Sequence, residues 1–402
     1  MLTPHRIVHL LPFASRIHEL RKRLCTSSRA SLALLLALLL GTGCTSNPSK
    51  PSAQTAAAPD ATTAARPAPS TSIESVEDWT YDGDKGLVIR TPHFRIYTTQ
   101  TEPILIDRLP GFLEAAMNHY RTAFASASRE SFEPLPPPSI KLDTFVLRTR
   151  TQWERLTKQL LADRSGPYLR IPRGGFAYGG RALLFDIGTH DTMAILAHEG
   201  WHQYIQRTFA QPLPIWLDEG IASYMEGHRW AAPTGDRGSL PVFMPWANTE
   251  RFDALRDAAA RNELASLSSL LESAPANLIG PGGDTGDALT YYSQVWALAH
   301  FLVEGADGRY RESLVKLLND AASGNIVRTV VAVFGPDGAR GLASRRGPVV
   351  FMAYFNRDLP EAETEYRAFI QRVVEPGSRG PIVEGRSPLS GSATPAGQSQ
   401  RR

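Results

Sequence analysis

Residues 195–227 constrain the fold and the chemistry of this chain more than any other segment. They contain the pattern H-E-x-x-H, in which His198 and His202 are four residues apart, and Glu219 follows within Trp-Leu-Asp-Glu-Gly. Side chains four residues apart lie on the same face of an α-helix, so the two imidazoles can bind a single metal ion from one side. The segment therefore predicts a helix over residues 189–209 that carries two metal ligands.

A catalytic zinc ion needs a third protein ligand and an open coordination position. A second predicted helix, over residues 213–225, contains Glu219 and can supply that ligand. Glu199 is adjacent to the first histidine and suits the role of general base. The metzincin alternative would require a glycine and a histidine where this chain has Ile205 and Thr208, so it is excluded.

Three further polar residues lie near or beyond this motif. His228 lies nine residues after Glu219, about 180° around an ideal helix, and cannot share its face if the helix continues that far. Glu226 does share that face, as either an outer partner of the metal ligands or a solvated charge. His300 stands alone in an apolar helical segment and is expected to be a packed core residue.

Cysteine content and charge restrict the kinds of metal site and binding partner that this chain can have. The only cysteines are Cys25 and Cys44, so the chain beyond Cys44 has no internal disulfide and no thiolate metal site. The chain has 43 Lys and Arg against 40 Asp and Glu, but residues 1–44 hold six of these bases and one of these acids. The remainder has a formal charge of about −2, which argues against nucleic-acid binding through bulk charge.

The N-terminal segment has the organisation of an export signal. Basic residues precede an apolar run at residues 32–40 that is too short to span a bilayer. Gly41-Thr42-Gly43-Cys44 follows and resembles the lipobox of bacterial lipoproteins, although Gly41 stands where Leu is commonest. We therefore predict a lipoprotein signal peptide over residues 1–44 and lipidation of Cys44. A plain signal peptide and an uncleaved anchor are the alternatives.

Residues 45–72 are nearly all Ser, Thr, Ala, Pro and Gln and cannot bury enough surface to fold, so they are predicted to form a disordered tether. Thr45 is not the Asp that retains some lipoproteins in the inner membrane. The expected location is therefore the periplasmic face of the outer membrane.

Hydrophobic periodicity predicts an α+β fold over residues 73–375, followed by a disordered tail over residues 376–402. A small mixed β-sheet lobe should pack on the zinc helix, and a mainly helical C-terminal lobe should follow. Predicted strands cover residues 93–99, 140–147 and 179–185; predicted helices cover residues 102–125, 151–161, 189–209, 213–225, 252–260, 264–271, 289–303, 310–318 and 362–374. The strand at 179–185 is either an edge strand that pairs with an extended peptide or an ordinary sheet strand.

Three motifs carry a resemblance to a known family: LAHEGWHQY, LPIWLDEGIASYMEG and YYSQVWAL at residues 291–298. In these motifs the chain resembles the gluzincin superfamily of metallopeptidases, specifically the peptidase MA-like (DUF1570-type) group. The resemblance implies a thermolysin-like fold with His198, His202 and Glu219 as zinc ligands and Glu199 as general base. Ser-Gln-Val-Trp departs from the group's Gln-Ser-Trp order, and the Gly-x-Met-Glu-Asn element of the aminopeptidases is missing.

The expected function is a zinc-dependent endopeptidase that acts on a peptide or protein substrate. An oxyanion needs a hydrogen-bond donor besides Zn²⁺, and Tyr292 is the first candidate, with Tyr291 and Tyr224 as alternatives. Core packing remains the competing interpretation for each tyrosine. Two other functions stay open: a non-catalytic envelope scaffold with a structural zinc, and hydrolysis of the peptide cross-bridges of the cell wall.

Overall fold

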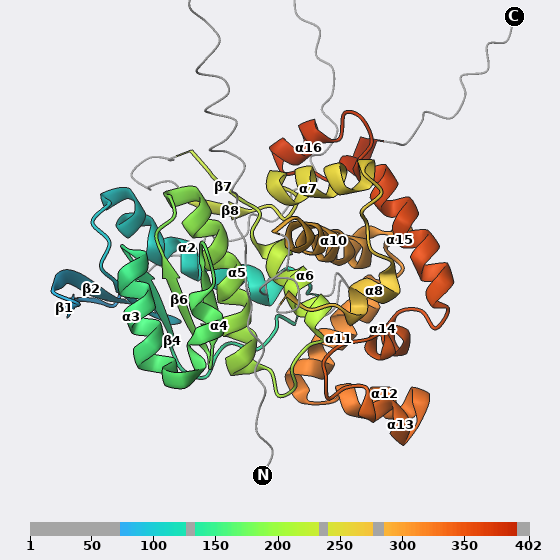
Figure 1. The fold of residues 1–402 in the computed structure, drawn as a ribbon, viewed down its shortest axis with the longest axis horizontal. Coiled ribbons are helices and arrows are strands. Elements are labelled where there is room, and N and C mark those ends of the chain that lie inside the picture. Colours follow the sequence, from blue (N-terminus) through green and yellow to red (C-terminus); the bar gives the residue numbers. More distant parts are fainter. Residues whose placement is uncertain (1–72, 126–132, 233–239, 276–284, 392–402) are drawn as a thin grey trace, which may run out of the picture. The chain divides into compact units, whose positions relative to one another are not determined.

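A mixed sheet forms the first part of the protein and consists of β1 (Ser75–Tyr81), β2 (Asp84–Arg90), β3 (Phe94–Thr98), β4 (Leu142–Leu147), β5 (Gly175–Tyr178) and β6 (Arg181–Phe185). The structure is a computed structural model that describes residues 73–125, 133–232, 240–275 and 285–391. The strand order is β1-β2-β3-β4-β6-β5 (Figure 1). β4 pairs parallel with β3 and β6, whereas the other neighbours are antiparallel. The predicted mixed sheet and α+β class are therefore confirmed.

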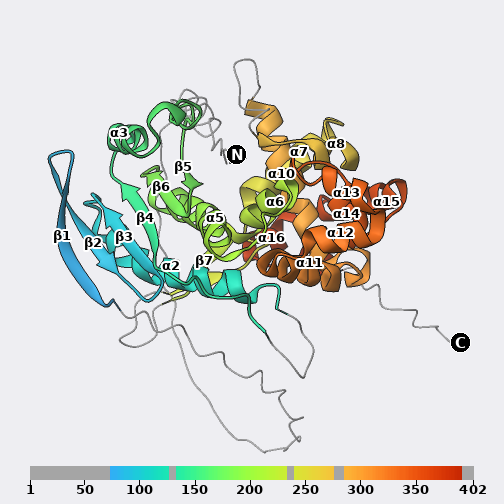
Figure 2. The ribbon, with the colours of Figure 1, turned by 90° about the horizontal axis from the view of Figure 1, so that it is seen from below.

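Both faces of the sheet are covered by helices near β6. Helices α2 (Pro103–Thr122) and α5 (Thr189–Thr208) lie on one face and α3 (Arg150–Leu161) on the other (Figure 2). Leu184 is buried in the core that contains α2 and α5, while its neighbour Leu183 is buried against α3. A strand buried on both faces reads as a continuous apolar run, which explains the sequence Ala-Leu-Leu-Phe in β6.

The hairpin β1–β2 was not predicted, because β1 has few apolar residues and is mostly exposed. Its turn contains Asp82 and Gly83 with φ of 54° and 82°. Two residues with positive φ are what a two-residue hairpin turn requires, and Asp-Gly is a favoured sequence for it. This hairpin could therefore have been predicted from the Asp-Gly dipeptide.

Of the two interpretations of residues 179–185, the edge strand is wrong and the ordinary sheet strand is confirmed. β6 pairs with β4 on one side and with β5 on the other, so its backbone groups are already used within the sheet. The edge on this side is β5, a strand of four residues in a segment for which no strand was predicted.

The second part of the structure is mainly helical, as predicted. Helix α10 (Thr285–Glu304) is its centre and packs against α6 (Ile215–Met225), α7 (Thr249–Ala260) and α15 (Leu359–Val373) (Figure 1). A Cβ on Gly220 of α6 would lie 2.7 Å from the carbonyl oxygen of Val295 in α10, so glycine permits the close approach of these two helices. The helices are α6 (Ile215–Met225), α7 (Thr249–Ala260), α8 (Leu267–Glu272), α10 (Thr285–Glu304), α11 (Arg311–Ser323), α12 (Ile326–Phe334), α13 (Pro336–Arg340), α14 (Val349–Tyr354), α15 (Leu359–Val373) and α16 (Arg379–Glu384).

Six short elements complete this description: helix α4 (Gly166–Leu169), the 3-10 helices η1 (Ala162–Arg164), η2 (Ala306–Gly308) and η3 (Pro388–Gly391), and strands β7 (His228–Trp230) and β8 (Pro241–Phe243), which pair with each other. All predicted strands and helices are present with boundaries shifted by a few residues. Helices α12, α13 and α14 were not predicted; they are short, and Gly335, Gly341 and Gly347 lie in the segments between them.

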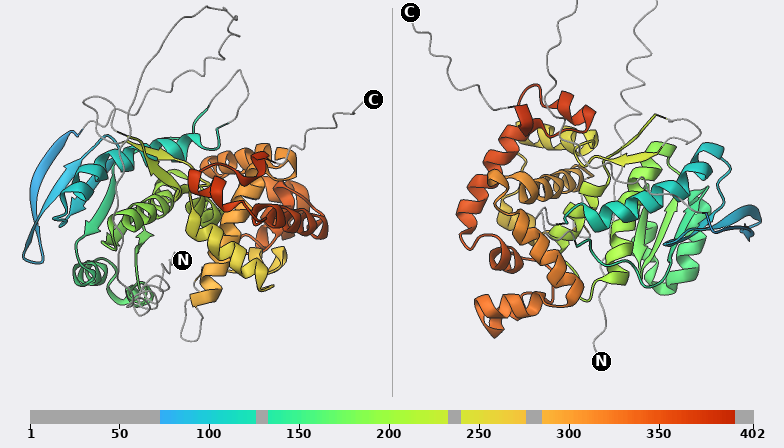
Figure 3. Two further views of the ribbon diagram at one scale, coloured as in Figure 1. Left: turned by 90° about the horizontal axis from the view of Figure 1, so that it is seen from above. Right: turned by 180° about the vertical axis from the view of Figure 1, so that it is seen from behind.

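The predicted disordered tail is wrong for residues 376–391, because α16 packs beside α7 (Figure 3). Ile382 is fully buried, and Arg379 Nε donates to Asp253 Oδ1 over 3.2 Å. Ser387 Oγ donates to Glu304 Oε2 over 2.7 Å. One buried apolar side chain and these polar contacts hold a segment whose composition alone suggested disorder.

The signal peptide, Cys44, the tether and residues 392–402 lie outside the described residues. Within the ranges that the structure describes, no helix is long and apolar enough to cross a membrane.

Candidate metal centre

Helix α5 places the H-E-x-x-H motif inside the protein. It begins after Gly188, whose φ of 105° favours glycine, and Asp191 lies in the first turn, where a carboxylate suits the helix dipole. The helix packs against β5 and β6 on one side and against α6 on another (Figure 2). His198, Glu199 and His202 are consequently fully buried.

Gly200, in the middle of the motif, allows α2 to approach α5. The hydroxyl of Tyr120 in α2 donates a hydrogen bond over 2.7 Å to the carbonyl oxygen of Ala197. A Cβ on Gly200 would lie 2.5 Å from that hydroxyl oxygen, and Tyr120 is fully buried. The absence of a side chain at Gly200 is therefore required by packing.

We expect Gly200→Ala to destabilise the protein by about 1 kcal/mol. Overpacking a core costs about 1–3 kcal/mol, whereas alanine in place of glycine in a helix returns at most about 1 kcal/mol. Urea unfolding measures the difference. In a Tyr120→Phe background the clashing oxygen is gone, so the same change to alanine should be neutral or stabilising. An equal loss in both backgrounds would show that the hydroxyl is not the cause.

Helix α6 supplies the carboxylate of Glu219, which is fully buried. Oε2 of Glu219 lies 3.4 Å from Nε2 of His198 and 3.6 Å from Nε2 of His202. One ligand atom from each of the three residues lies within 4.8 Å of the others. The structure thus brings together the three predicted ligands in an arrangement that could hold a metal ion.

The ring of His198 is held from behind by Glu226. Nδ1 of His198 lies 2.8 Å from Oε1 of Glu226. Arg251 binds both oxygens of this carboxylate, through Nη2 at 2.8 Å and Nε at 3.1 Å, and Asn248 donates to Oε2 over 2.7 Å. Burial opposes the charged form of Glu226, but Arg251 and His198 outweigh it and lower its pKa to about 2. Glu226 is therefore a charged partner of a candidate ligand and not a solvated residue.

The ring of His202 is held in the same manner by Asp218. Nδ1 of His202 lies 2.7 Å from Oδ1 of Asp218, and Nη2 of Arg345 lies 2.7 Å from Oδ2. A carboxylate on the second ring nitrogen fixes the orientation and the tautomer of a metal-binding histidine. In both histidines Nε2 is thereby directed at Glu219.

Glu199 lies beside the three candidate ligands but is not one of them. Burial raises the pKa of its carboxyl to about 7, although the nearby His198 and His202 act in the opposite direction. The backbone of Ala177 in the edge strand β5 faces this carboxylate and also lowers its pKa. A carboxyl group that titrates near neutrality suits the transfer of protons.

The tyrosine candidates occupy different places. The ring of Tyr292 in α10 is fully buried, with its centre 6.1 Å from that of His198 and 5.0 Å from the guanidinium carbon of Arg251. Burial raises the pKa of Tyr292 well above its usual value, and the charges of Glu219 and Glu199 add to the effect. Tyr292 therefore borders both the candidate ligands and the candidate base.

Tyr291 also lies near the ligands. Burial raises its pKa well above the usual value, and the nearby charges of Glu219 and Asp218 raise it further. Tyr224 instead packs against Phe124 and His300. The structure therefore keeps Tyr291 as an alternative donor but does not bring Tyr224 to the site.

Two histidines prove to be outside the candidate ligand group. His228 packs against the ring of Phe112, and its Nδ1 lies 2.9 Å from the backbone oxygen of Glu226. His300 is buried as predicted, with its ring stacked on Trp246 at a centroid distance of 3.7 Å.

We expect a metal ion to displace protons when it binds. Burial opposes protonation of His202, but Asp218 and Glu219 outweigh it and raise its pKa to about 10. The metal-free ring therefore carries a proton at pH 7, whereas a metal ligand must be a neutral imidazole. Metal affinity should consequently rise with pH from 7 towards 10. Calorimetry in buffers of different ionisation enthalpy should detect proton release, and binding without it would contradict this assignment.

Asp218, Arg251 and Arg345 were not predicted from the sequence. A histidine that binds a metal ion usually contacts a carboxylate through its second ring nitrogen. Asp218, which is adjacent to Glu219, could have been proposed for this role on that ground. No local pattern marked Arg251 or Arg345, which reach the site through the folding of distant segments.

The fold and the three candidate ligands define an α+β protein with a buried His-His-Glu group able to bind a metal ion. Residues 192–326 match the model of a family described as a protein of unknown function (DUF1570). The matched segment contains the three candidate ligands, Glu199, Tyr292 and the partners Asp218, Glu226 and Arg251, but not Arg345 or Ala177. Comparison with curated proteins finds no match.

Proposed function

We propose that this protein is a zinc-dependent peptidase that hydrolyses bonds within peptide or protein chains. The observation that supports it most is the position of Glu199, a buried carboxylate beside three candidate ligands. A structural zinc site would need the ligands but would have no use for this fourth group. A non-catalytic scaffold with a structural zinc ion would give Glu199 no role, so we favour the peptidase.

The donor set fits zinc. Two imidazoles and one carboxylate are a common set in catalytic zinc sites, in which one coordination position stays open. His198, His202 and Glu219 would hold the ion. When bound, zinc would act as a Lewis acid and lower the pKa of water in its open position towards about 7.

The residues of this chain supply the remaining functions. Glu199 would accept a proton from the attacking water and later deliver it to the nitrogen of the leaving peptide. The hydroxyl of Tyr292 would donate to the developing oxyanion, with Tyr291 as the alternative donor. Glu226 and Asp218 would keep the ligand histidines in orientation.

A peptide substrate would pass along β5. Extended peptides can pair with the edge strand of a sheet, where main-chain hydrogen bonds supply the affinity. β5 is the edge strand that packs against α5, and Ala177 within it faces Glu199. Residues 175–177 are buried in this structure, so a peptide would have to displace the residues that cover them. A peptide paired with this edge would therefore approach the candidate base.

Digestion of a pool of unstructured peptides tests the proposed activity. We expect cleavage at internal bonds, lost on removal of metal by a chelator and restored by zinc. Mass spectrometry identifies the new termini. Release of single residues from the peptide ends would instead indicate an exopeptidase.

We also propose that the protein is exported and anchored to the bacterial outer membrane through a lipid on Cys44. The leader and the cysteine in a lipobox-like context support this location. Cys44→Ala should move the protein from the membrane fraction to the soluble fraction after cell lysis. Unchanged membrane association would contradict the lipid anchor.

A further inference from the structure

Arg345 comes from the segment between α13 and α14, 127 residues after Asp218 in the sequence. Its side chain binds the start of α6 twice. Nη2 donates to Oδ2 of Asp218 over 2.7 Å, and Nε donates to the carbonyl oxygen of Leu213 over 2.6 Å. Its own carbonyl oxygen accepts a hydrogen bond over 2.9 Å from the backbone amide of Ile215. One residue therefore holds the beginning of the helix that carries Glu219.

The ion pair is almost completely removed from solvent. The side chain of Asp218 is 3% exposed and that of Arg345 is 17% exposed. Screening by water is weak at such a site, so loss of the guanidinium would leave a buried carboxylate without its ion-pair partner. The φ of Arg345 is 58°, a left-handed value that non-glycine residues adopt infrequently. The contacts with α6 fix the backbone in this conformation.

We propose that Arg345 is a positioning residue of the metal centre and acts on His202 through Asp218. Arg345 holds Oδ2 of Asp218, and Oδ1 of the same carboxylate holds Nδ1 of the imidazole. The ring is thereby kept with Nε2 towards Glu219. This inference rests on the metal-binding part of the proposed function and does not depend on peptide hydrolysis.

The same arrangement recurs behind the other histidine, which supports a common role. Arg251 binds Glu226, and Glu226 binds Nδ1 of His198. Each candidate ligand histidine thus has a carboxylate that is itself held by an arginine. Arg345 differs from Arg251 in that it lies outside the segment that matches the family, which ends at residue 326. The C-terminal part of the chain therefore completes the centre.

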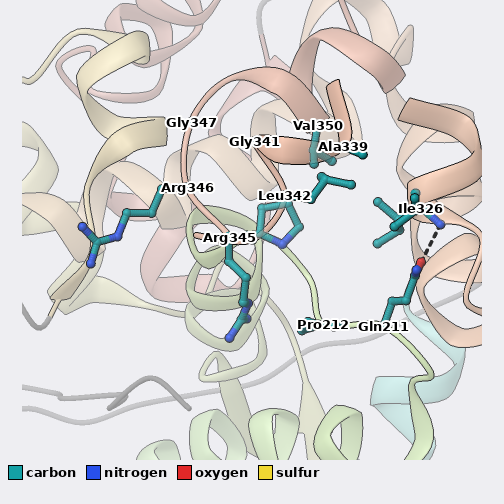
Figure 4. A pocket seen from close by; sticks show the side chains of 13 residues that line it. Gln211, Pro212, Ile326, Ala339, Gly341, Leu342, Arg345, Arg346, Gly347 and Val350 are labelled. Carbon is teal, nitrogen blue, oxygen red and sulfur yellow. Dashed lines mark hydrogen bonds between the residues drawn. The ribbon is translucent and has the colours of Figure 1, made fainter. Parts of the chain in front are cut away.

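Arg345 is also the better of the two arginines for a test by substitution. Arg251 is only 1% exposed and is enclosed by its surroundings. Arg345 lines a cavity of about 290 Å³, whose space can accept a changed side chain (Figure 4). Figure 4 shows the side chain of the adjacent Arg346 pointing away from that of Arg345. Arg346 lines the same cavity and its charge acts on Tyr291, so it is the control for loss of one positive charge near the centre.

Zinc affinity of the full chain, measured by competition with a chromophoric chelator, tests the proposal. Loss of a residue that contacts a metal ligand directly typically costs about 10- to 100-fold in affinity. Arg345→Met should weaken binding by up to about 10-fold, the lower end of that range, because Arg345 acts through Asp218. Arg345→Lys should recover part of this loss, because it restores the positive charge without the second hydrogen bond. Arg346→Met should bind zinc as the parent protein does.

A double-mutant cycle separates positioning from general stability. If Arg345 acts through Asp218, Arg345→Met should add little to the loss of affinity caused by Asp218→Asn. The visible spectrum of bound Co²⁺ should also change in Arg345→Met and stay unchanged in Arg346→Met. Additive losses, or lower urea resistance with unchanged zinc affinity and spectrum, would overturn the proposal. A parent protein that binds no zinc would overturn both this proposal and the proposed function.

Discussion

Replacement of Glu199 by glutamine should abolish peptide hydrolysis and leave zinc bound. The substitution keeps the size of the side chain but removes the carboxylate that would accept and deliver protons. General acid–base catalysis contributes about 10²- to 10⁴-fold to a rate, so cleavage should fall by at least about 10²-fold. Cleavage of an unfolded protein, together with zinc content by elemental analysis, measures both parts of this expectation.

Glu250→Gln is the matched control, because Glu250 is a partly buried glutamate whose pKa burial likewise raises to about 7. It lies beside Arg251 and outside the candidate ligands. We expect it to retain most of the cleavage activity. Equal activity of the parent protein and Glu199→Gln would show that Glu199 is not the base.

Glu219→Ala should remove the metal itself. Glu219 is the member of the group that lies within 3.6 Å of both imidazole Nε2 atoms, and it comes from a different helix. Its loss would leave two ligands, fewer than a catalytic zinc site needs. Zinc affinity should therefore fall by more than the about 100-fold expected for loss of an outer partner. Competition with a chelator measures the dissociation constant.

His228→Ala is the comparison for this experiment. His228 is a buried potential ligand close in sequence to Glu219, but it is engaged with the Glu226 backbone and the Phe112 ring. Zinc affinity should be retained in this variant. Loss of zinc in His228→Ala together with its retention in Glu219→Ala would reassign the third ligand.

The candidate ligands could be located from the sequence because their relation is mostly local. The spacing of His198 and His202 places them on one face of a helix whatever the rest of the fold does. Glu219 follows on the next helix, and packing of α6 against α5 brings it to the same place. Local periodicity and one helix–helix contact are sufficient for this part of the centre.

The outer partners could not be located in the same way. Arg345 approaches Asp218 across 127 residues, and its contact depends on the course of the segment between two short helices. From sequence, Glu226 is either an outer partner of the metal ligands or a solvated charge, because sequence does not show whether a charge faces solvent or a buried arginine. Arg251 decides this case, since it binds both carboxylate oxygens in the interior.

The sheet shows a similar limit. β1 is largely exposed and β5 has four residues, so neither gives the alternating apolar pattern on which strand prediction depends. The omission of β5 matters for function, because without it residues 179–185 could be interpreted as the edge of the sheet. Pairing between strands is a non-local property, and an edge is identified only when both neighbours of a strand are known.

Titration of the metal-free protein with zinc tests the central claim most directly. Cleavage of an unfolded protein should be absent at the start and rise in proportion to added zinc. It should reach a plateau at one zinc ion per chain, when His198, His202 and Glu219 together hold the ion. A chain that binds one zinc ion and cleaves no peptide at any point of the titration would contradict the account.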